Sequence, residues 1–489
     1  MVSLLLKALA ITGAVLLIAA GLITIPRHVL DLEQQRSLGE GSLVTLLASQ
    51  DESTAARAAL AIGRTKQRGG VSPLEKRLSA HDDGVRAMSV YALGLIGLGS
   101  GSDTIVALAE RDASGAVRVA ALDAIGRYEA AKSLSTKSET LAQAAASRVL
   151  VRDADAIVRG RAAITLGFFA EGPRGADAAN ALTSALRIEK DDAVRERIMW
   201  TIFRRYAARV PRAVLAGHLQ DSDEIVRIEA ARAFGKLKDS SAIPALTPLL
   251  ADRSWRVQEQ AAESIRVLLG KKPTDHWTAI PQSVHTPAPN ADMLASLPVL
   301  VPEKHAKPVA PNLFDAATEP AIDPHTARDM TGPAPGRHPR VRIVTTRGNV
   351  YVVLYPEWAP MTVLNFLNLA QNGFYSNNPW FRIVPDFVVQ TGEKDAKNAP
   401  GPGYTIRAEE NPVEQSSYVI SMGLDYDAKT NTPKRDSAGS EYYITLSPQY
   451  HLDNDFSVFG EVTGGADVLG RLVESDKVVR IERIADVTL

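Results

Sequence analysis

Cysteine is absent from this chain of 489 residues. Its absence excludes disulfide bonds, thiolate metal sites and a cysteine nucleophile, and it is compatible with an oxidising compartment. An excess of either charge is also missing, because 55 basic side chains stand against 56 acidic ones, for a formal net charge of −1. No global field therefore draws the protein toward nucleic acid, and we expect no nucleic-acid partner.

A glycine-rich phosphate loop is missing as well. The stretch GPGYT at 401–405 lacks the lysine and the following helix that such a loop needs. Grouped metal ligands are also lacking, since five of the nine histidines lie between 271 and 340 at spacings of 9 to 20 residues. We therefore expect no cofactor and no metal.

An uncharged apolar run of eighteen residues, from Ala8 to Ile25, stands at the beginning of the chain. This length suits a membrane-spanning helix, so residues 1–30 are predicted to be a transmembrane anchor or a signal peptide. The small residues at 18–20 are compatible with cleavage, whereas the continuation of the run to Ile25 favours an uncleaved anchor. Lys7, in front of the run, favours a cytoplasmic N-terminus. The body is then expected to be membrane-anchored and periplasmic or otherwise extracytoplasmic, or secreted to the periplasm after cleavage.

One pattern recurs through the middle of the chain: an acidic or small residue, then Val-Arg, then a helical segment. The arginine position recurs 29 to 41 residues apart. It holds Ala55, Arg86, Arg118, Arg159, Arg195, Arg227 and Arg256. Six residues later every copy has a small side chain, and in five copies glycine follows two residues after that. Small residues at a fixed position are what close packing between helices requires, so seven helical repeats are predicted.

A second apolar helix precedes each copy, as in AIPALTPLL at 242–250, so each unit is a helix pair that buries its apolar face only by stacking on its neighbours. Over residues 40–270 the pattern resembles short HEAT repeats. The resemblance implies an all-α solenoid with an extended surface for a protein partner. For the recurring arginines we predict ion pairs with neighbouring aspartates rather than contacts with a ligand.

Residues 271–340 differ in composition, since 13 of the 28 prolines fall there. This stretch has no helical or strand periodicity. It is predicted to be an extended, proline-rich linker.

Beyond the linker, residues 341–489 have the pattern of short strands and two helices. RVRIVTTRGNVYVVLYP at 340–356 reads as two strands about a turn, and APMTVLNFLNLAQNGFY at 359–375 as a helix that proline opens and glycine closes. WFRIVPDFVVQTGE at 380–393 reads as a strand pair about a Pro-Asp turn. A β-barrel capped by two helices fits this order.

Together with GPGYTI, GSEYYITL and HLDNDFSVFGEV, these stretches resemble a cyclophilin-type peptidyl-prolyl cis-trans isomerase. The resemblance implies a closed β-barrel with two helices. The chain as a whole is then multidomain: N-terminal membrane helix, HEAT-like solenoid, linker and cyclophilin-like domain.

The resemblance also implies site residues. Arg382 is the cation that donates to the prolyl nitrogen, and Gln390, placed on the same strand face by its even spacing from Arg382, holds substrate backbone. The substrate-binding positions are Phe387, Val388, Gly423, Tyr443, His451, Leu452 and Phe456. Packing in a core is the alternative for Phe387 and Val388, and a surface ion pair is the alternative for Arg382.

Several positions depart from the family pattern. Glu441 stands where glutamine is usual, His451 where a tryptophan is usual, and residues 425–436 enlarge a loop. These changes leave the rate and the range of substrates open.

The sequence therefore favours a prolyl isomerase that acts on proline-containing client polypeptides, with a solenoid that binds protein, as a folding or assembly factor. The alternative is a non-enzymatic scaffold whose cyclophilin-like domain only binds proline-containing peptides.

Overall fold

The computed structural model describes residues 27–172, 174–270, 337–393 and 401–488. The predicted anchor or signal peptide, apart from its last few residues, and nearly all of the predicted linker lie outside these ranges. None of the helices in these ranges is long and apolar enough to cross a membrane. The chain divides into two compact units, and each is described by itself.

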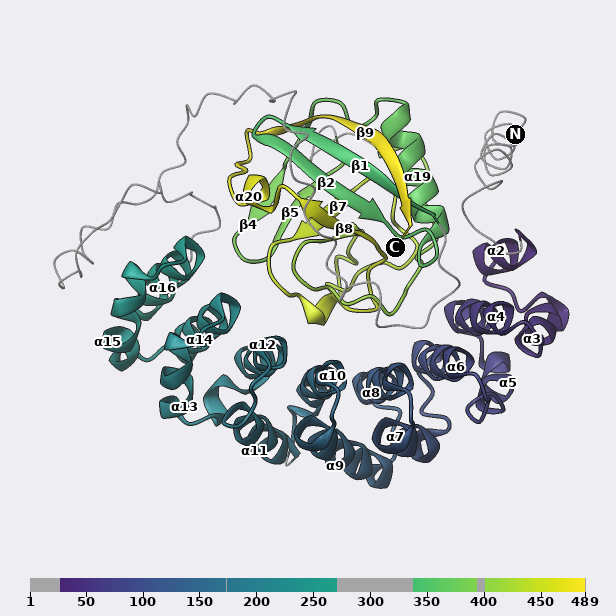
Figure 1. The fold of residues 1–489 in the computed structure, drawn as a ribbon, viewed down its shortest axis with the longest axis horizontal. Helices are drawn as coiled ribbons and strands as arrows, with labels where there is room; N and C mark the ends of the chain where they lie inside the picture. Colours follow the sequence, from purple (N-terminus) through teal and green to yellow (C-terminus); the bar gives the residue numbers. More distant parts are fainter. Residues whose placement is uncertain (1–26, 173, 271–336, 394–400, 489) are drawn as a thin grey trace. The chain divides into compact units, whose positions relative to one another are not determined.

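The first unit described here is a stack of seven helix pairs; the short helix α2 (Arg27–Gln34), which precedes it in the sequence, is grouped with the other unit. The first helices of the pairs are α3 (Ser42–Leu47), α5 (Val71–Glu75), α7 (Ser102–Arg111), α9 (Thr136–Arg152), α11 (Arg174–Leu186), α13 (Arg212–Gly217) and α15 (Ile243–Leu246). The second helices are α4 (Glu52–Thr65), α6 (Asp83–Ile96), α8 (Gly115–Ala130), α10 (Ala156–Leu166), α12 (Asp192–Thr201), α14 (Glu224–Leu237) and α16 (Trp255–Leu268). Within this array, Figure 1 shows the second helices side by side in one row and the first helices in another. The seven predicted repeats are thus present.

In five of the seven copies an acidic residue explains where the second helix begins. Asp51, Asp82 and Asp191 are N-caps whose carboxylates accept a hydrogen bond from a backbone N–H in the first turn. Asp155 and Asp223 do the same for α10 and α14. Because the first N–H groups of a helix have no partner inside it, such a cap stabilises the helix by about 1 kcal/mol.

The small residues of the motif explain how closely the pairs stack. A Cβ added to Gly63 would lie 2.7 Å from Cα of Ala92, and one added to Gly94 would lie 2.9 Å from Cα of Ala124. Ala92 and Ala124 are the small residues of the following repeats. Glycine in one repeat therefore faces a small residue in the next, so that the backbones of the second helices approach each other.

The recurring arginines form a ladder of ion pairs along the array, as predicted. Each of five reaches an acidic residue between the two helices of the next pair, at 2.7 to 2.9 Å. The pairs are Arg86–Asp112, Arg118–Asp153, Arg159–Glu189, Arg195–Asp221 and Arg227–Asp252. The prediction of aspartate partners is wrong at Arg159, where glutamate takes the place, and Arg256 pairs instead with Glu224 of the preceding repeat.

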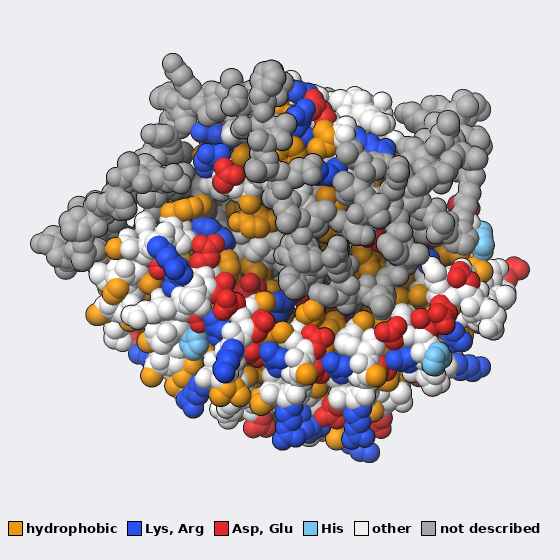
Figure 2. All heavy atoms as spheres, viewed as in Figure 1, with side chains coloured by type: hydrophobic (Ala, Val, Ile, Leu, Met, Phe, Trp, Pro, Cys, Tyr) orange, Lys and Arg blue, Asp and Glu red, His pale blue; other side chains and the backbone are white. Residues whose placement is uncertain are grey.

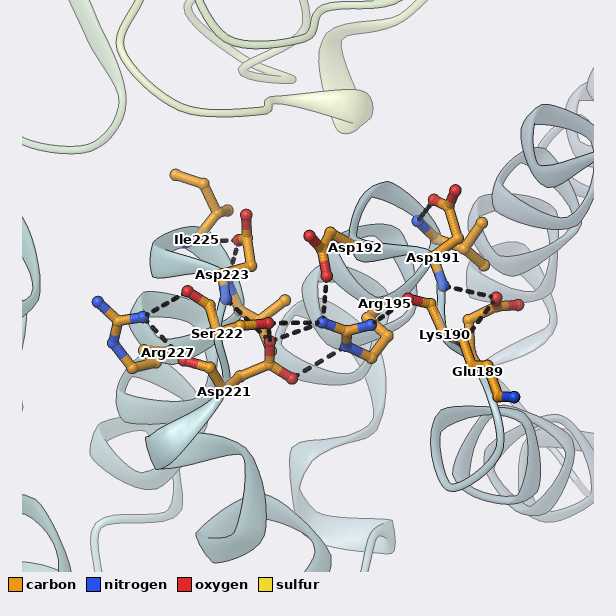
Figure 3. A network of polar contacts seen from close by, with 12 residues as sticks. Glu189, Lys190, Asp191, Asp192, Arg195, Asp221, Ser222, Asp223, Ile225 and Arg227 are labelled. Carbon is orange, nitrogen blue, oxygen red and sulfur yellow. Dashed lines mark hydrogen bonds and ion pairs between the residues drawn. The ribbon is translucent and has the colours of Figure 1, made fainter.

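The middle of the ladder shows how one arginine joins two repeats (Figure 3). Arg195 donates to both carboxylate oxygens of Asp221, at 3.0 and 2.9 Å, and to the carbonyl of Lys190 at 2.8 Å. Burial would raise the pKa of Asp221, but hydrogen bonds from Arg195 and from a backbone N–H hold it below its usual value. Bidentate contacts of this kind fix geometry as well as charge.

Basic and acidic side chains also lie beside one another on the face of the array that Figure 2 shows. This mixture is the surface counterpart of the near-zero net charge.

The second unit contains a single curled sheet of nine strands in the order β3-β9-β1-β2-β8-β6-β7-β5-β4 (Figure 1). The strands are β1 (Arg337–Thr345), β2 (Gly348–Leu354), β3 (Asn378–Pro379), β4 (Arg382–Val384), β5 (Val388–Thr391), β6 (Val419–Met422), β7 (Tyr442–Thr445), β8 (Val458–Gly464) and β9 (Lys477–Thr488). All pairs are antiparallel. Among the described residues from 337 onward, the α-helices are α19 (Pro360–Gln371) and the four-residue α20 (Ala466–Leu469).

The predicted closure of the sheet into a barrel is not confirmed, because among the described strands β3 and β4 are the two edges. Strand β3 has only two residues, and one of them, Pro379, has no N–H to donate. The carbonyl of Pro379 accepts a hydrogen bond from the hydroxyl of Thr391 at 2.8 Å instead. A side-chain contact thus takes the place of backbone pairing.

Strand β1 begins inside the stretch predicted as linker. His338 and Pro339 pair with Val487 and Asp486 of β9, whereas pairing with β2 starts only at Arg340. Proline is tolerated there because only one side of the strand is hydrogen-bonded at that point.

The core of this unit is aromatic. Phe366 of α19 lies 5.3 Å from the ring of Tyr375, 5.4 Å from that of Tyr442 and 5.3 Å from that of Phe459. The N-terminus of α19 is capped from far along the chain, since the carboxylate of Glu409 accepts the N–H of Thr362 at 2.8 Å. Helix and sheet are thus joined by packing and by a buried polar contact.

Candidate active site

The predicted site residues lie on the edge strand β4, on β5 beside it, on β7 beyond β5, and in the loops that follow β4, β6 and β7. Arg382 opens β4, and the tight turn after Val384 leads to Phe387 and β5. Asp386 in this turn has a φ of 47°, in the left-handed region that aspartate tolerates better than most residues. The Pro-Asp turn predicted from the sequence is therefore present.

Arg382 and Gln390 face each other across the ladder. The two residues are register partners in the β4–β5 pair, and Nη1 of Arg382 donates to Oε1 of Gln390 at 3.0 Å. Their side chains do share one face, as predicted, but through pairing between two strands rather than spacing along one strand. The side chain of Arg382 is exposed, so its remaining donors face solvent.

Four of the predicted wall residues form one buried apolar cluster: Val388, Tyr443, Leu452 and Phe456. The rings of Tyr443 and Phe456 meet edge to face, with centroids 5.7 Å apart. Partly buried Phe387 packs against this cluster, as does Leu424, a residue that the sequence analysis missed. Leu424 directly follows Gly423, so its position beside a predicted site residue was the available signal.

Phe387 joins the apolar cluster to the arginine. The guanidinium carbon of Arg382 lies 5.3 Å from the centroid of its ring, within the range of a cation–π interaction. His451 also stacks on Phe387, with the ring centroids 5.9 Å apart. The structure thus brings a cation, an amide and an apolar wall together on one side of the sheet edge.

Gly423 contributes space rather than contact. A Cβ at this position would lie 2.8 Å from Cγ of Glu441, and the N–H of Gly423 donates to the carbonyl of Glu441 at 2.7 Å. Oε1 of Glu441 in turn accepts a hydrogen bond from Nε2 of Gln390. Glu441 departs from the family pattern, and its contact with Gln390 was not predicted from the sequence.

The enlarged loop at 425–436 is an ordered hairpin. Tyr426 pairs with Pro433 in a β-bridge, and Asp427 accepts hydrogen bonds from the N–H groups of Lys429 and Thr430. Burial raises the pKa of the Tyr426 hydroxyl, and the charge of Arg382 acts in the opposite direction. The hairpin therefore adds an exposed aromatic side chain, that of Tyr426.

Metal chemistry finds no support in the described part of the chain, where no three histidine, cysteine or acidic side chains are grouped to hold an ion. What the arrangement offers is hydrogen-bond donation from a cation next to an apolar surface.

Comparison with known proteins points the same way. The family described as "Cyclophilin type peptidyl-prolyl cis-trans isomerase/CLD" matches residues 340–488, and "HEAT repeats" matches 42–126 and 205–270. Between those two HEAT matches, the structure continues the same helix pairs.

Two relatives show the extent of the similarity. The peptidyl-prolyl cis-trans isomerase B of Bacillus subtilis is 38% identical over 133 residues, which cover 26% of this chain and 87% of that protein. The peptidyl-prolyl cis-trans isomerase of Helicobacter pylori is 33% identical over 138 residues, which cover 27% of this chain and 80% of that protein. A solved cyclophilin-type isomerase of Cryptosporidium parvum is 22% identical, with a TM-score of 0.27, over 30% of this chain and 99% of that one.

Proposed function

The chain belongs to the cyclophilin-type family of peptidyl-prolyl cis-trans isomerases, and on this premise we propose that Arg382 and Gln390 catalyse the rotation of X-Pro bonds in client proteins. The observation that carries the proposal is the position of Arg382. Its guanidinium is held by Gln390 at 3.0 Å and by the ring of Phe387 at 5.3 Å, beside the buried apolar cluster. A proline ring against the apolar side chains would place its nitrogen near the cation.

The chemistry needs no nucleophile. Rotation about the X-Pro amide breaks partial double-bond character, against a barrier of roughly 18–20 kcal/mol. A hydrogen bond to the prolyl nitrogen stabilises its pyramidal, deconjugated form, which exists only in the twisted transition state. Arg382 therefore favours the transition state over both ground states, which is the condition for catalysis.

The other predicted residues hold the substrate. Gln390 binds backbone of the peptide, while Phe387 and the cluster of Val388, Tyr443, Leu452 and Phe456 hold the proline ring. His451 extends the wall by stacking on Phe387.

Replacement of Arg382 by alanine tests this assignment. We expect Arg382→Ala to lower kcat/KM for an X-Pro peptide by about 10² to 10³, the cost of losing one donor to the transition state. The exposed Arg471, which pairs with Asp467 four residues earlier, gives the control Arg471→Ala. Wild-type turnover in Arg382→Ala would overturn the assignment, and an inactive wild type would favour the alternative of a peptide-binding scaffold.

The array of helix pairs is proposed to bind a protein partner and so to present clients to the isomerase, as a folding or assembly factor. Its extended row of second helices and its HEAT-type repeats support this role.

The apolar run at 8–25 is proposed to anchor the protein in a membrane or to direct its export, with the body outside the cytoplasm. The support is the sequence alone. Protease accessibility in intact cells and spheroplasts tests the proposal, and a body protected until the inner membrane is lysed would contradict it.

A further inference from the structure

A chain of polar contacts runs inward from the arginine across three neighbouring strands. Arg382 at the start of β4 donates to Oε1 of Gln390 on β5, and Nε2 of Gln390 donates to Oε1 of Glu441, directly before β7. We propose that Glu441 is a positioning residue for the isomerase: its ionised carboxylate fixes the amide of Gln390 and, through it, the guanidinium of Arg382. The inference rests on the proposed function, and it adds a residue that controls the geometry of the same site.

The chemistry of the three groups defines a single arrangement. A guanidinium can only donate hydrogen bonds, and an ionised carboxylate can only accept them. The amide of Gln390 between them satisfies both neighbours only with its oxygen toward Arg382 and its nitrogen toward Glu441. A protonated Glu441 gains an O–H donor, so the constraint at this end of the amide is lost.

The packing around Glu441 holds its side chain in that place. A Cβ at residue 423 would lie 2.8 Å from Cγ and 2.9 Å from Cδ of Glu441, so glycine leaves the space that this side chain fills. The backbone of Glu441 is fixed on the same side, because its carbonyl accepts the N–H of Gly423 at 2.7 Å. The contact with Gln390 is thus part of a built arrangement rather than one rotamer of a surface glutamate.

The charges that surround Glu441 set where it titrates. Burial raises the pKa of Glu441 to about 7, and the like charges of Glu393 after β5 and Asp425 after β6 add to the rise. The hydrogen bond from Gln390 and the charge of Arg382 act in the opposite direction. Burial and Asp425 also raise the pKa of Glu393. Glu441 therefore changes charge near neutral pH, where an ordinary glutamate would stay ionised.

The test is the pH profile of isomerase activity in the full chain. With an X-Pro peptide that has no ionisable side chain, kcat/KM should rise from about pH 5.5 to about pH 8 with a midpoint of about 7. About one pH unit below the midpoint it should fall to about a tenth of the plateau, as for one essential ionised group.

Two variants separate positioning from a merely structural role. Glu441→Gln keeps the shape and one acceptor oxygen, but it cannot ionise and its amide can also turn N–H groups toward Gln390, so we expect a flat profile below the wild-type plateau. Glu393→Gln removes a neighbouring negative charge, so it should move the midpoint to lower pH without changing the plateau.

An active wild type with a flat profile, or a Glu441→Gln variant that keeps the inflection, would overturn this inference alone. Absence of isomerase activity at every pH would overturn the proposed function and this inference with it.

Discussion

A single side chain carries the proposed chemistry, so its exact shape matters. Arg382 uses one nitrogen on Gln390 and the face of its guanidinium on Phe387, which leaves its other N–H groups for a substrate. Lysine offers a point charge without the planar fork and cannot make these contacts at once.

Arg382→Lys should therefore recover only part of the activity that Arg382→Ala loses. A charge-assisted hydrogen bond is worth about 1.5–3 kcal/mol, so kcat/KM should stay at least about tenfold below wild type. The measurement is the same peptide assay at one fixed pH, with Arg471→Lys as the matched control. A lysine variant as active as wild type would show that charge alone suffices.

A second residue-scale prediction concerns stability. Glu357 is buried, with Oε2 3.5 Å from Nδ1 of His338, and burial raises the pKa of Glu357 to about 7. Between its ordinary value of 4.5 and 7, the folded chain keeps this proton while the unfolded chain releases it. The unfolded state then binds fewer protons, so this group makes the free energy of unfolding fall as pH rises through that range.

His338 opposes this trend, because burial lowers the pKa of His338 below 6.5. The unfolded state then binds more protons at this group, so its contribution to the free energy of unfolding increases as pH rises toward 6.5. Glu357→Gln removes the contribution of Glu357 to the pH dependence of stability and keeps that of His338. The variant should gain up to about 3 kcal/mol over wild type above about pH 7 and match it near pH 4.5. Denaturant unfolding at several pH values measures the difference, and a difference that does not change with pH would contradict the assigned cause.

At the scale of elements, the array was the more predictable half. Its signals are local: a cap, an arginine and small residues recur at fixed spacing within each helix, and adjacent repeats meet in sequence order. The structure adds a reason for the spacing, because Gly63 and Gly94 face Ala92 and Ala124 of the next repeat.

This packing predicts opposite effects of the same substitution at two helical glycines. Gly63→Ala places a Cβ 2.7 Å from the backbone of Ala92, so it should destabilise the array by about 1–3 kcal/mol despite the better helix propensity of alanine. Gly217 in α13 has a φ of −60° and no atom within 4 Å of an added Cβ. Gly217→Ala should stabilise by about 0.4–1 kcal/mol. Thermal unfolding of both variants checks this, and two changes of the same sign would count against the packing argument.

The individual strands of the sheet could be predicted from the sequence, whereas the order of the strands in the sheet could not. The resemblance of the motifs to cyclophilins implied the residues of the apolar cluster, and the Pro-Asp turn predicted the strand pair that became β4 and β5. The contact between Gln390 and Glu441 joins residues 51 apart, and its existence depends on the order of strands in the sheet. Spacing along one strand contains no such information, which is why the reason given for the shared face of Arg382 and Gln390 was wrong.

At the scale of the whole molecule, two units with separate cores serve one proposed function. The buried residues of the array come from its own helices, and the aromatic core of the other unit comes from α19 and the sheet. Each unit therefore has the apolar interior that an independent domain needs. The concentration of prolines at 271–340 was the reason to expect a boundary in that stretch, and the predicted bounds stay a prediction.

The last prediction follows from joining a catalyst to a binding surface in one chain. A short X-Pro peptide reaches only the isomerase, so the fragment 337–489 should match the full chain in kcat/KM within about twofold. An unfolded protein client that also binds the array meets the isomerase at the high effective concentration that a linker provides, which can raise apparent affinity by about 10² or more. We therefore expect the full chain to accelerate proline-limited refolding of such a client at concentrations where the fragment has little effect.

Adding the separate array, residues 36–270, to the fragment should not restore the effect, because the two are no longer linked. A fragment as effective as the full chain on protein clients would show that the array does not recruit them, while leaving the isomerase assignment intact.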